Sequence, residues 1–208
     1  GDQMAVHVPL SVAAQACGAD ALLVVAPYYN KGNPEGQFAH FASIAHEVDI
    51  PIILYNVPGR TGVDLTVALY QQLSALANIV GVKEACTDIT KTARIRNACG
   101  TDFTIWSGND DMAIPAMSIG AKGVISVVSN VLPKETNLMV QAALKGDWNT
   151  ASNLQCQFLP IIDALFREVN PIPVKAAMRI IGFDCGECRL PLGPASKQTM
   201  ELLRLILK

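Results

Sequence analysis

The sequence predicts an α/β protein built from repeated strand–helix units, and it favours a (β/α)8 TIM barrel over an open sheet. Three observations support this: short apolar runs rich in valine and isoleucine, helical periodicity between them, and reactive side chains where the runs end. Continuous apolar runs are typical of parallel strands that are covered on both faces. A barrel gathers the carboxyl ends of all its strands around one site, so every strand is expected to contribute side chains there.

Five runs are expected to be strands: residues 21–29, 51–57, 79–85, 103–107 and 123–128. Segments with helical periodicity lie between them, at roughly 35–48, 65–77, 89–99 and 110–119. Residues 131–208 contain no strand signal and are expected to form helices at 133–145, 148–168, 172–182 and 195–207. The sequence therefore predicts a partial barrel of about five βα units in residues 1–130. The last barrel helix and a C-terminal helical extension follow in residues 131–208.

Capping residues mark the ends of several of these helices. Asp64, Asp88 and Asp147 stand where N-caps are expected, and Gly146 and Gly182 stand where helices should stop. Five strands cannot close a barrel of eight. Either further strands lie upstream of Gly1, which does not resemble a natural translation start, or the chain has a different and smaller fold.

Composition restricts the classes of protein that fit. Half of the 208 residues are hydrophobic and 16% are charged, which favours a sizeable buried core. The net charge of −2 gives no sign of a nucleic-acid partner. No apolar run approaches the roughly 18–20 residues of a membrane span, and no signal-peptide pattern is present. Six scattered cysteines are expected to be reduced thiols of a cytoplasmic protein.

Lys83 lies inside the apolar run "IVGVKEA", residues 79–85, and is the first candidate catalytic residue. An arbitrary lysine at a strand end most often extends its ammonium group into solvent. Near a barrel axis, desolvation would instead lower the pKa of the amine and make it a nucleophile toward a ketone, giving a Schiff base. Tyr55 in the preceding strand could exchange a proton with such an adduct, or could pack as plain core.

Two further groups stand near strand ends. Arg60 follows Tyr55 in a loop opened by Pro58, and its planar guanidinium would suit a substrate carboxylate if it points into the mouth of the barrel. Tyr28 and Tyr29 end the first run, where packing at an interface explains them equally well.

The motifs "PYYN", "YNVPGRTG", "GVKEA", "GVISV" and "NPIPVK" together resemble the dihydrodipicolinate synthase family. This family is a branch of the pyruvate-dependent class I aldolase-like lyases and is related to N-acetylneuraminate lyase. The resemblance covers essentially the whole chain, and it implies a TIM barrel that here lacks about its first three strands. It also implies a homotetramer built as a dimer of tight dimers, acting in lysine biosynthesis by the diaminopimelate route.

The implied reaction is the condensation of pyruvate with aspartate 4-semialdehyde. It proceeds through a covalent imine between pyruvate and Lys83, and no cofactor or metal is implied. By resemblance, Tyr55 is the proton-relay tyrosine and Arg60 meets the carboxylate of the aldehyde substrate. The resemblance also implies that Tyr29 reaches into the relay of a neighbouring subunit, with Tyr28 as its interface companion. Gly108 and Ile125 are implied to be pocket residues. The "GRTG" sequence at 59–62 favours the synthase branch over sialic-acid lyases.

The sequence departs from the family in one motif. Family members carry a Thr-Thr pair after their second strand, which completes the relay and holds the carboxylate of pyruvate, and this chain has no such pair. Two alternatives therefore stay open: a related aldolase with another aldehyde substrate, and an impaired partial barrel that serves as a subunit or binding module. Asp2 and Val6 stand where lysine-inhibited members have Asn and Glu, so inhibition by lysine is not expected.

The weaker signals are given structural interpretations. The pair Cys185 and Cys188 forms a CxxC without a second pair or a nearby histidine, so it does not predict a zinc or redox site. Cys86 is expected to be a small core residue. The three histidines fall in helical segments without metal-ligand spacing, so surface or helix-packing roles are expected for His7, His40 and His46.

Overall fold

The computed structural model describes residues 4–208, with side chains described from Val6 onward. Asp2, one of the two positions compared with lysine-inhibited relatives, lies outside these residues. The chain forms two compact units. The first runs to Asn109 and includes Pro115–Val124, and the second comprises Asp110–Ile114 and Ile125–Lys208. The predicted division of the chain at residue 130 stays a prediction.

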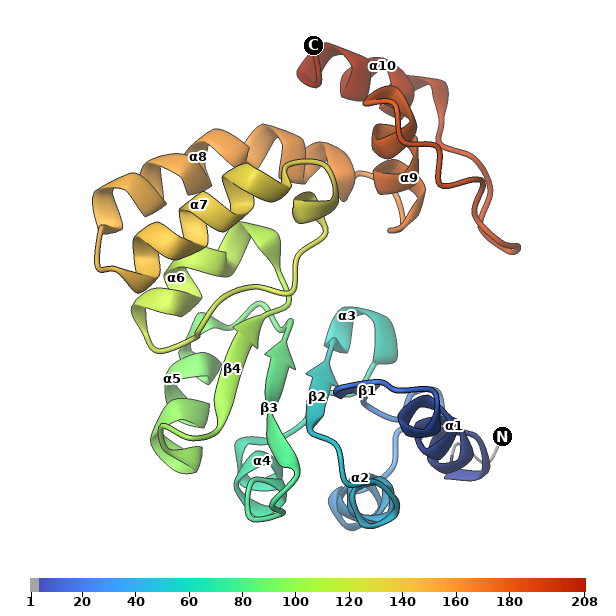
Figure 1. The fold of residues 1–208 in the computed structure, drawn as a ribbon, viewed down its shortest axis with the longest axis vertical. Coiled ribbons are helices and arrows are strands. Elements are labelled where there is room, and N and C mark those ends of the chain that lie inside the picture. Colours follow the sequence, from blue (N-terminus) through green and yellow to red (C-terminus); the bar gives the residue numbers. More distant parts are fainter. Residues whose placement is uncertain (1–3) are drawn as a thin grey trace. The chain divides into compact units, whose positions relative to one another are not determined.

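The first unit is built on a parallel sheet whose strands follow chain order, as Figure 1 shows. Its strands are β1 (Leu22–Val25), β2 (Ile52–Asn56), β3 (Ile79–Glu84) and β4 (Thr104–Ser107). All three neighbouring pairs are parallel. A doubly wound sheet reverses its strand order at a switch point, whereas a barrel does not. The order β1-β2-β3-β4 is therefore the winding of a barrel, and four of the five predicted strands are confirmed.

Helices cover one face of this sheet. They are α1 (Met4–Ala16), α2 (Pro34–Glu47), α4 (Val67–Leu73) and α5 (Ile89–Cys99), with the short helix α3 (Pro58–Thr61) after β2. The contacts α1 with α2, α2 with α4, and α4 with α5 join them into a single layer. Leu54 of β2, Val82 of β3 and Ile44 of α2 are completely buried in the core between sheet and helices.

Burial alternates along the strands because successive side chains point to opposite faces. In β2 the buried residues Ile52, Leu54 and Asn56 alternate with the half-buried Ile53 and Tyr55. The buried side chains share the helix-covered face with the core, and the half-buried side chains lie on the open face. In β3, at Gly81, an added Cβ would lie 2.1 Å from the carbonyl oxygen of Thr104 in β4, so only glycine permits this close approach.

The predicted fifth strand, 123–128, is wrong in extent. It is reduced to one parallel bridge between Ser107 and Val124, followed by the 3-10 helix η2 (Val128–Asn130). The reason is a tertiary contact, because the backbone N–H groups of Val127 and Val128 donate to the Asp110 carboxylate at 2.9 and 3.1 Å. These N–H groups are therefore unavailable to a strand ladder.

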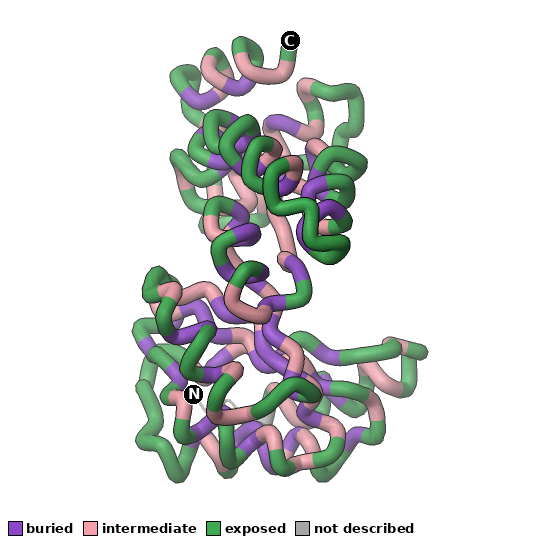
Figure 2. Tube along the Cα trace, turned by 90° about the vertical axis from the view of Figure 1, so that its left-hand side faces the viewer, coloured by how far each residue is buried: buried purple, intermediate pink, exposed green. Residues whose placement is uncertain are grey.

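The second unit is mainly helical, with its core on the facing sides of four helices. These are α7 (Pro133–Leu144), α8 (Trp148–Leu165), α9 (Ile172–Ile180) and α10 (Lys197–Ile206), which match the four predicted helices to within a few residues. The predicted segment 110–119 belongs to the second unit as far as Ile114 and to the first unit from Pro115 onward. It forms the 3-10 helix η1 (Asp110–Met112) and the helix α6 (Ala113–Ser118). In Figure 2 the helices carry exposed residues on one side and buried residues on the other, the amphipathic pattern that packed helices require.

The helix caps confirm most of the predicted signals. Asp88 and Asp147 accept backbone N–H groups as N-caps of α5 and α8, and Gly146 and Gly182 follow helix ends with φ of 82° and 94°. The prediction for Asp64 is wrong, because Thr66 caps α4 instead. The Asp64 carboxylate is engaged elsewhere, as described below.

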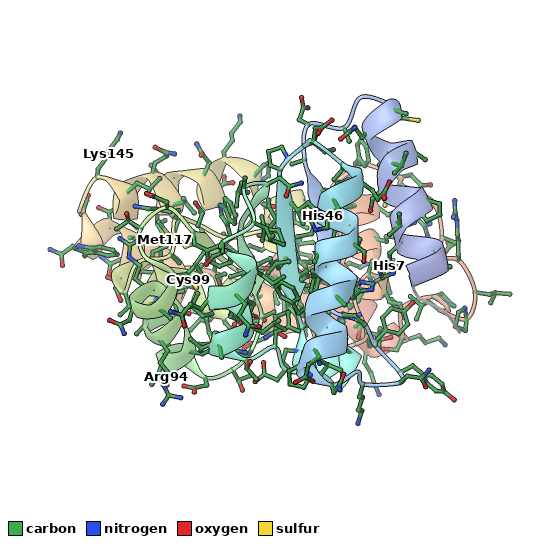
Figure 3. All side chains as sticks on the ribbon, turned by 90° about the horizontal axis from the view of Figure 1, so that it is seen from below. His7, His46, Arg94, Cys99, Met117 and Lys145 are labelled. Atoms are coloured by element: carbon green, nitrogen blue, oxygen red, sulfur yellow. The ribbon has the colours of Figure 1, made fainter. Side chains whose placement is uncertain are left out.

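Two histidines hold the first two helices together, as expected of helix-packing residues. Nδ1 of His7 in α1 lies 3.1 Å from Nε2 of His40 in α2, and Figure 3 shows His7 on the side of α1 that faces α2. His40 is buried, and burial followed by the charge of His7 lowers its pKa to about 4.

Within residues 4–208, no helix is long and apolar enough to cross a membrane.

Candidate active site

Lys83 and Tyr55 face each other on the open side of the sheet. They are register partners on adjacent strands, each one residue from the carboxyl end of its strand. The ammonium nitrogen of Lys83 lies 4.3 Å from the centroid of the Tyr55 ring. A cation held against an aromatic face at this distance is stabilised electrostatically, so the tyrosine favours this position of the amine. The predicted pair is therefore brought together.

Burial raises the pKa of the Tyr55 phenol, and the positive charge of Arg60 opposes this with a smaller effect. Because the pKa moves up from an ordinary value near 10, the phenol is protonated at neutral pH. Tyr55 can therefore donate a hydrogen bond or a proton to an oxygen atom on a substrate attached to Lys83.

Arg60 lies in helix α3 rather than in a loop, which corrects the prediction. Pro58 is the first residue of this helix, where its fixed φ is favourable, and Gly62 ends the helix with φ of 67°. Thr61 stabilises the turn, because its hydroxyl oxygen lies 3.1 and 2.9 Å from the carbonyl oxygens of Val57 and Val63 and can donate its one hydrogen to either. Arg60 is exposed and lies close enough for its charge to act on Tyr55.

Tyr28 and Tyr29 lie beyond the end of β1, which stops at Val25, so the first run forms a shorter strand than predicted. Their side chains are 50% and 83% exposed. Tyr29 has φ of 71°, a left-handed conformation that costs a non-glycine residue roughly 1–2 kcal/mol. Two large aromatic side chains are thus held out into solvent beside the edge of the sheet that carries Tyr55 and Lys83.

The two predicted pocket residues lie in different units. Gly108 follows β4, and its N–H donates to the carbonyl oxygen of Glu84 at 2.7 Å. An added Cβ at Gly108 would lie 2.6 Å from the Cβ of Ala85, so no side chain fits between these two strand ends. Ile125 belongs to the second unit and stays a predicted pocket residue.

Sequence reasoning missed a buried polar cluster directly behind the reactive pair. Its centre is Glu84, whose carboxylate accepts hydrogen bonds from Asn56 at 2.7 Å, from the backbone N–H of Cys86 at 2.9 Å and from the Tyr70 hydroxyl at 2.9 Å. The Lys91 ammonium lies 3.6 Å from the same carboxylate. Glu84 is 5% exposed, and a charge this deeply buried requires such partners.

A signal for this cluster was present in the sequence. Asn56 and Glu84 each follow a predicted catalytic residue by one position, so strand alternation places them on the helix-covered face. Burial, followed by the negative charge of Glu84, raises the pKa of the neighbouring Cys86 thiol to about 12, and this side chain is half-buried rather than core.

The arrangement suits carbonyl chemistry. A lysine amine beside a neutral phenol can form a carbinolamine with a ketone and assist the loss of water. Among residues 4–208, no group of three or more His, Cys, Asp and Glu side chains could hold a metal ion.

Cys185 and Cys188 are free thiols in the loop after α9, where the Lys175 ammonium bonds the carbonyl oxygens of residues 185–187.

A parallel sheet wound in one direction, with a lysine and a tyrosine facing each other at its carboxyl edge, is the arrangement of a Schiff-base enzyme on a TIM-barrel scaffold. The chain belongs to the dihydrodipicolinate synthetase family, whose model matches residues 3–208. The fold class predicted from the sequence is confirmed by this membership and by the solved structures that the chain resembles.

The 4-hydroxy-tetrahydrodipicolinate synthase of Acetivibrio thermocellus is 45% identical over 209 residues, covering 100% of this chain and 71% of the relative. The crystal structure of dihydrodipicolinate synthase from Thermotoga maritima is 42% identical with a TM-score of 0.96, covering 99% of this chain and 71% of that one. The chloride-inhibited enzyme from Acinetobacter baumannii, solved in complex with pyruvate, is 41% identical with a TM-score of 0.94. That match covers 98% of this chain and 70% of the other.

Proposed function

We propose that this chain is a lyase that condenses pyruvate with aspartate 4-semialdehyde through a Schiff base on Lys83, in the diaminopimelate route to lysine. The observation that carries the proposal is the Lys83 ammonium held 4.3 Å over the Tyr55 ring on paired strands. Curated relatives that are 45–49% identical carry the name of this synthase, which supports the same activity here.

The chemistry follows from the two side chains. The Lys83 amine attacks the keto carbon of pyruvate, and the Tyr55 phenol supplies the proton with which the carbinolamine hydroxyl leaves as water. The phenolate left on Tyr55 then takes a methyl proton from the imine, which gives an enamine, and the enamine carbon adds to the aldehyde, whose oxygen takes that proton back from Tyr55. Attack of the substrate's own amine or of water on the resulting imine releases the Lys83 amine. Arg60 is the candidate partner of the aldehyde substrate's carboxylate, since a guanidinium binds a carboxylate through two parallel hydrogen bonds. Gly108 and Ile125 are proposed to line the pyruvate pocket, and no cofactor or metal is assigned.

The proposed assembly is a homotetramer made of tight dimers, with Tyr28 and Tyr29 at the tight interface and Tyr29 entering the relay of the neighbouring subunit. The exposure of both side chains supports an interface role, because large aromatic residues are enriched at protein–protein contacts. Sedimentation velocity of the chain and of Tyr29→Ala tests this assembly. The six cysteines are all free, which supports a reducing cytoplasmic location.

Incubation with pyruvate and sodium borohydride tests the activity. Reduction of the imine leaves a stable adduct whose mass is located by peptide mapping, and Lys83 is the residue expected to carry it. An unmodified Lys83 in folded protein would refute the proposal. Turnover with aspartate 4-semialdehyde, and its loss in Arg60→Ala, then separates this synthase from an aldolase that uses another aldehyde.

A further inference from the structure

The side chains behind Lys83 and Tyr55 form a closed ring. Asn56 donates to Glu84 at 2.7 Å and to Asp64 at 2.8 Å, and the Lys91 ammonium bonds Asp64 and lies 3.6 Å from Glu84. The four members come from β2, β3, the segment after α3, and α5. Asn56 is 0% exposed, and its amide oxygen accepts the backbone N–H of Leu65 at 3.1 Å. The ring is therefore fixed to the backbone as well as to itself.

This ring connects the segments that carry all three central site residues. Glu84 and Asn56 follow Lys83 and Tyr55 by one residue and are register partners in the same way. Asp64 comes shortly after helix α3, which carries Arg60. The ring therefore adjoins the segments that carry the lysine, the tyrosine and the arginine.

The backbone at this point is also tied on both sides. The N–H of Ala85 donates to the carbonyl oxygen of Asn56 at 2.9 Å, and the N–H of Gly108 donates to that of Glu84 at 2.7 Å. Side chains on successive strand residues leave opposite faces in fixed directions. Hydrogen bonds fix both the side chain and the carbonyl group of Glu84. The direction in which the Lys83 side chain leaves the opposite face of the sheet is therefore fixed as well.

We propose that Glu84 is a positioning residue, which holds the Lys83 amine against Tyr55 through the ring that it forms with Asn56, Asp64 and Lys91. This inference rests on the proposed function, because the position matters for imine formation. Stability alone is a weak reason for such a ring, since a buried ion pair replaced by apolar side chains of similar volume often leaves a protein equally stable. Placement of a reacting amine is a stronger reason, because a displacement of 1 Å can cost about 10²-fold in rate.

Glu84→Gln tests the proposal with little change of shape. An amide cannot accept at both atoms, so one side of the ring loses its acceptor whichever way the Gln is turned. Asn78→Ala is the matched control. It lies at the other end of β3 and loses two hydrogen bonds, to the carbonyl oxygens of Ala45 and Val48 at 2.9 and 2.8 Å, without touching the ring.

The readout is the rate at which borohydride traps the pyruvate imine, measured against pyruvate concentration while each variant is shown to be folded. In Glu84→Gln the limiting rate is expected to fall about 10- to 100-fold, with a smaller change in half-saturating pyruvate. Asn78→Ala should keep the wild-type rate even though it also loses stability. A wild-type rate in folded Glu84→Gln, or equal losses in both variants, would overturn the proposal.

Two additions keep the test decisive. If Glu84→Gln does not fold, Tyr70→Phe removes a single bond to Glu84, and the limiting rate should fall about 2- to 10-fold. If the wild-type chain traps no pyruvate, the proposed function fails by itself, and crystal structures of the wild type and a folded ring variant decide the positioning role. The Lys83 nitrogen should move from its place 4.3 Å over the Tyr55 ring, and an unchanged distance would refute the inference.

Discussion

The two faces of the sheet differ most where β2 and β3 end. On the open face, Tyr55 and Lys83 are half-buried and present a phenol and an amine to whatever enters. One residue further on, Asn56 and Glu84 are buried under the helices with their hydrogen-bonding groups occupied. Both faces are polar at this level, yet one side is available to a substrate and the other is fully engaged. Because successive strand residues point to opposite faces, the reactive pair and the buried residues behind it are only one position apart along each strand.

The largest expected effect comes from removing the open-face amine. Lys83→Met should abolish the borohydride-trapped pyruvate adduct, because it removes the amine that lies against Tyr55 and is proposed to form the imine. The exposed Lys122→Met provides the matched control and should retain the adduct in full. Intact-mass measurement after reduction is sufficient. An adduct of equal yield in Lys83→Met would show that another residue is the nucleophile.

The next effect concerns the other half of the reactive pair. Tyr55→Phe should slow imine trapping by about 10²- to 10⁴-fold, the usual cost of removing a general acid. Because burial raises the pKa of Tyr55, its phenol stays protonated, and the loss should be similar from roughly pH 6 to pH 9. Trapping kinetics across this range check the prediction. A loss of trapping rate that appears only at one end of this pH range would show that another group donates the proton.

On the covered face, substitution should reduce stability first. Lys91→Met leaves the buried Glu84 carboxylate without its cation, and the free energy of unfolding should fall by about 3–5 kcal/mol. Urea unfolding measures this difference, with Lys122→Met as the exposed control that should change little. A double variant, Glu84→Gln with Lys91→Met, should recover part of the loss because both charges are gone. A single-variant change below about 1 kcal/mol would contradict a buried, coupled pair.

The smallest effect lies in the helix layer, away from the reactive pair. The pKa of His40 falls from 6.5 to about 4 on folding, so the unfolded chain binds more protons between these values. The contribution of His40 to stability is therefore complete above pH 6.5 and is lost as the pH falls toward 4. Urea midpoints should decline over this interval, and His40→Gln should flatten the decline. His46→Gln, on the exposed side of the same helix, should leave it unchanged.

Sequence reasoning reached one face of the sheet and missed the other. Lys83 and Tyr55 were predictable because a charge and a phenol at the ends of apolar strands are conspicuous, and parallel strands bring their ends together. The ring behind them was not predictable as a unit. Its hydrogen bonds join residues up to 28 positions apart, as from Asn56 to Glu84, and which carboxylate meets which amine depends on helix placement.

Two of the wrong assignments have similar causes. Asp64 looked like a helix cap, but its carboxylate bonds Lys91 and Asn56, and Thr66 caps the helix instead. Residues 123–128 looked like a strand, but a side chain distant in sequence, that of Asp110, takes two of its N–H groups. Local propensity was overridden in both cases by a tertiary hydrogen bond that local pattern does not reveal.

The raised pKa of Cys86 bears on chemoselectivity. A thiolate is an excellent nucleophile toward carbonyl compounds, and Cys86 is only three residues from Lys83 along the chain. With a pKa of about 12, only about one thiol in 10⁵ is ionised at neutral pH. Burial and the Glu84 carboxylate thus suppress a competing sulfur nucleophile at the end of the strand that supplies the amine. Of these two neighbouring nucleophiles, the thiol is therefore the one kept in its unreactive protonated form.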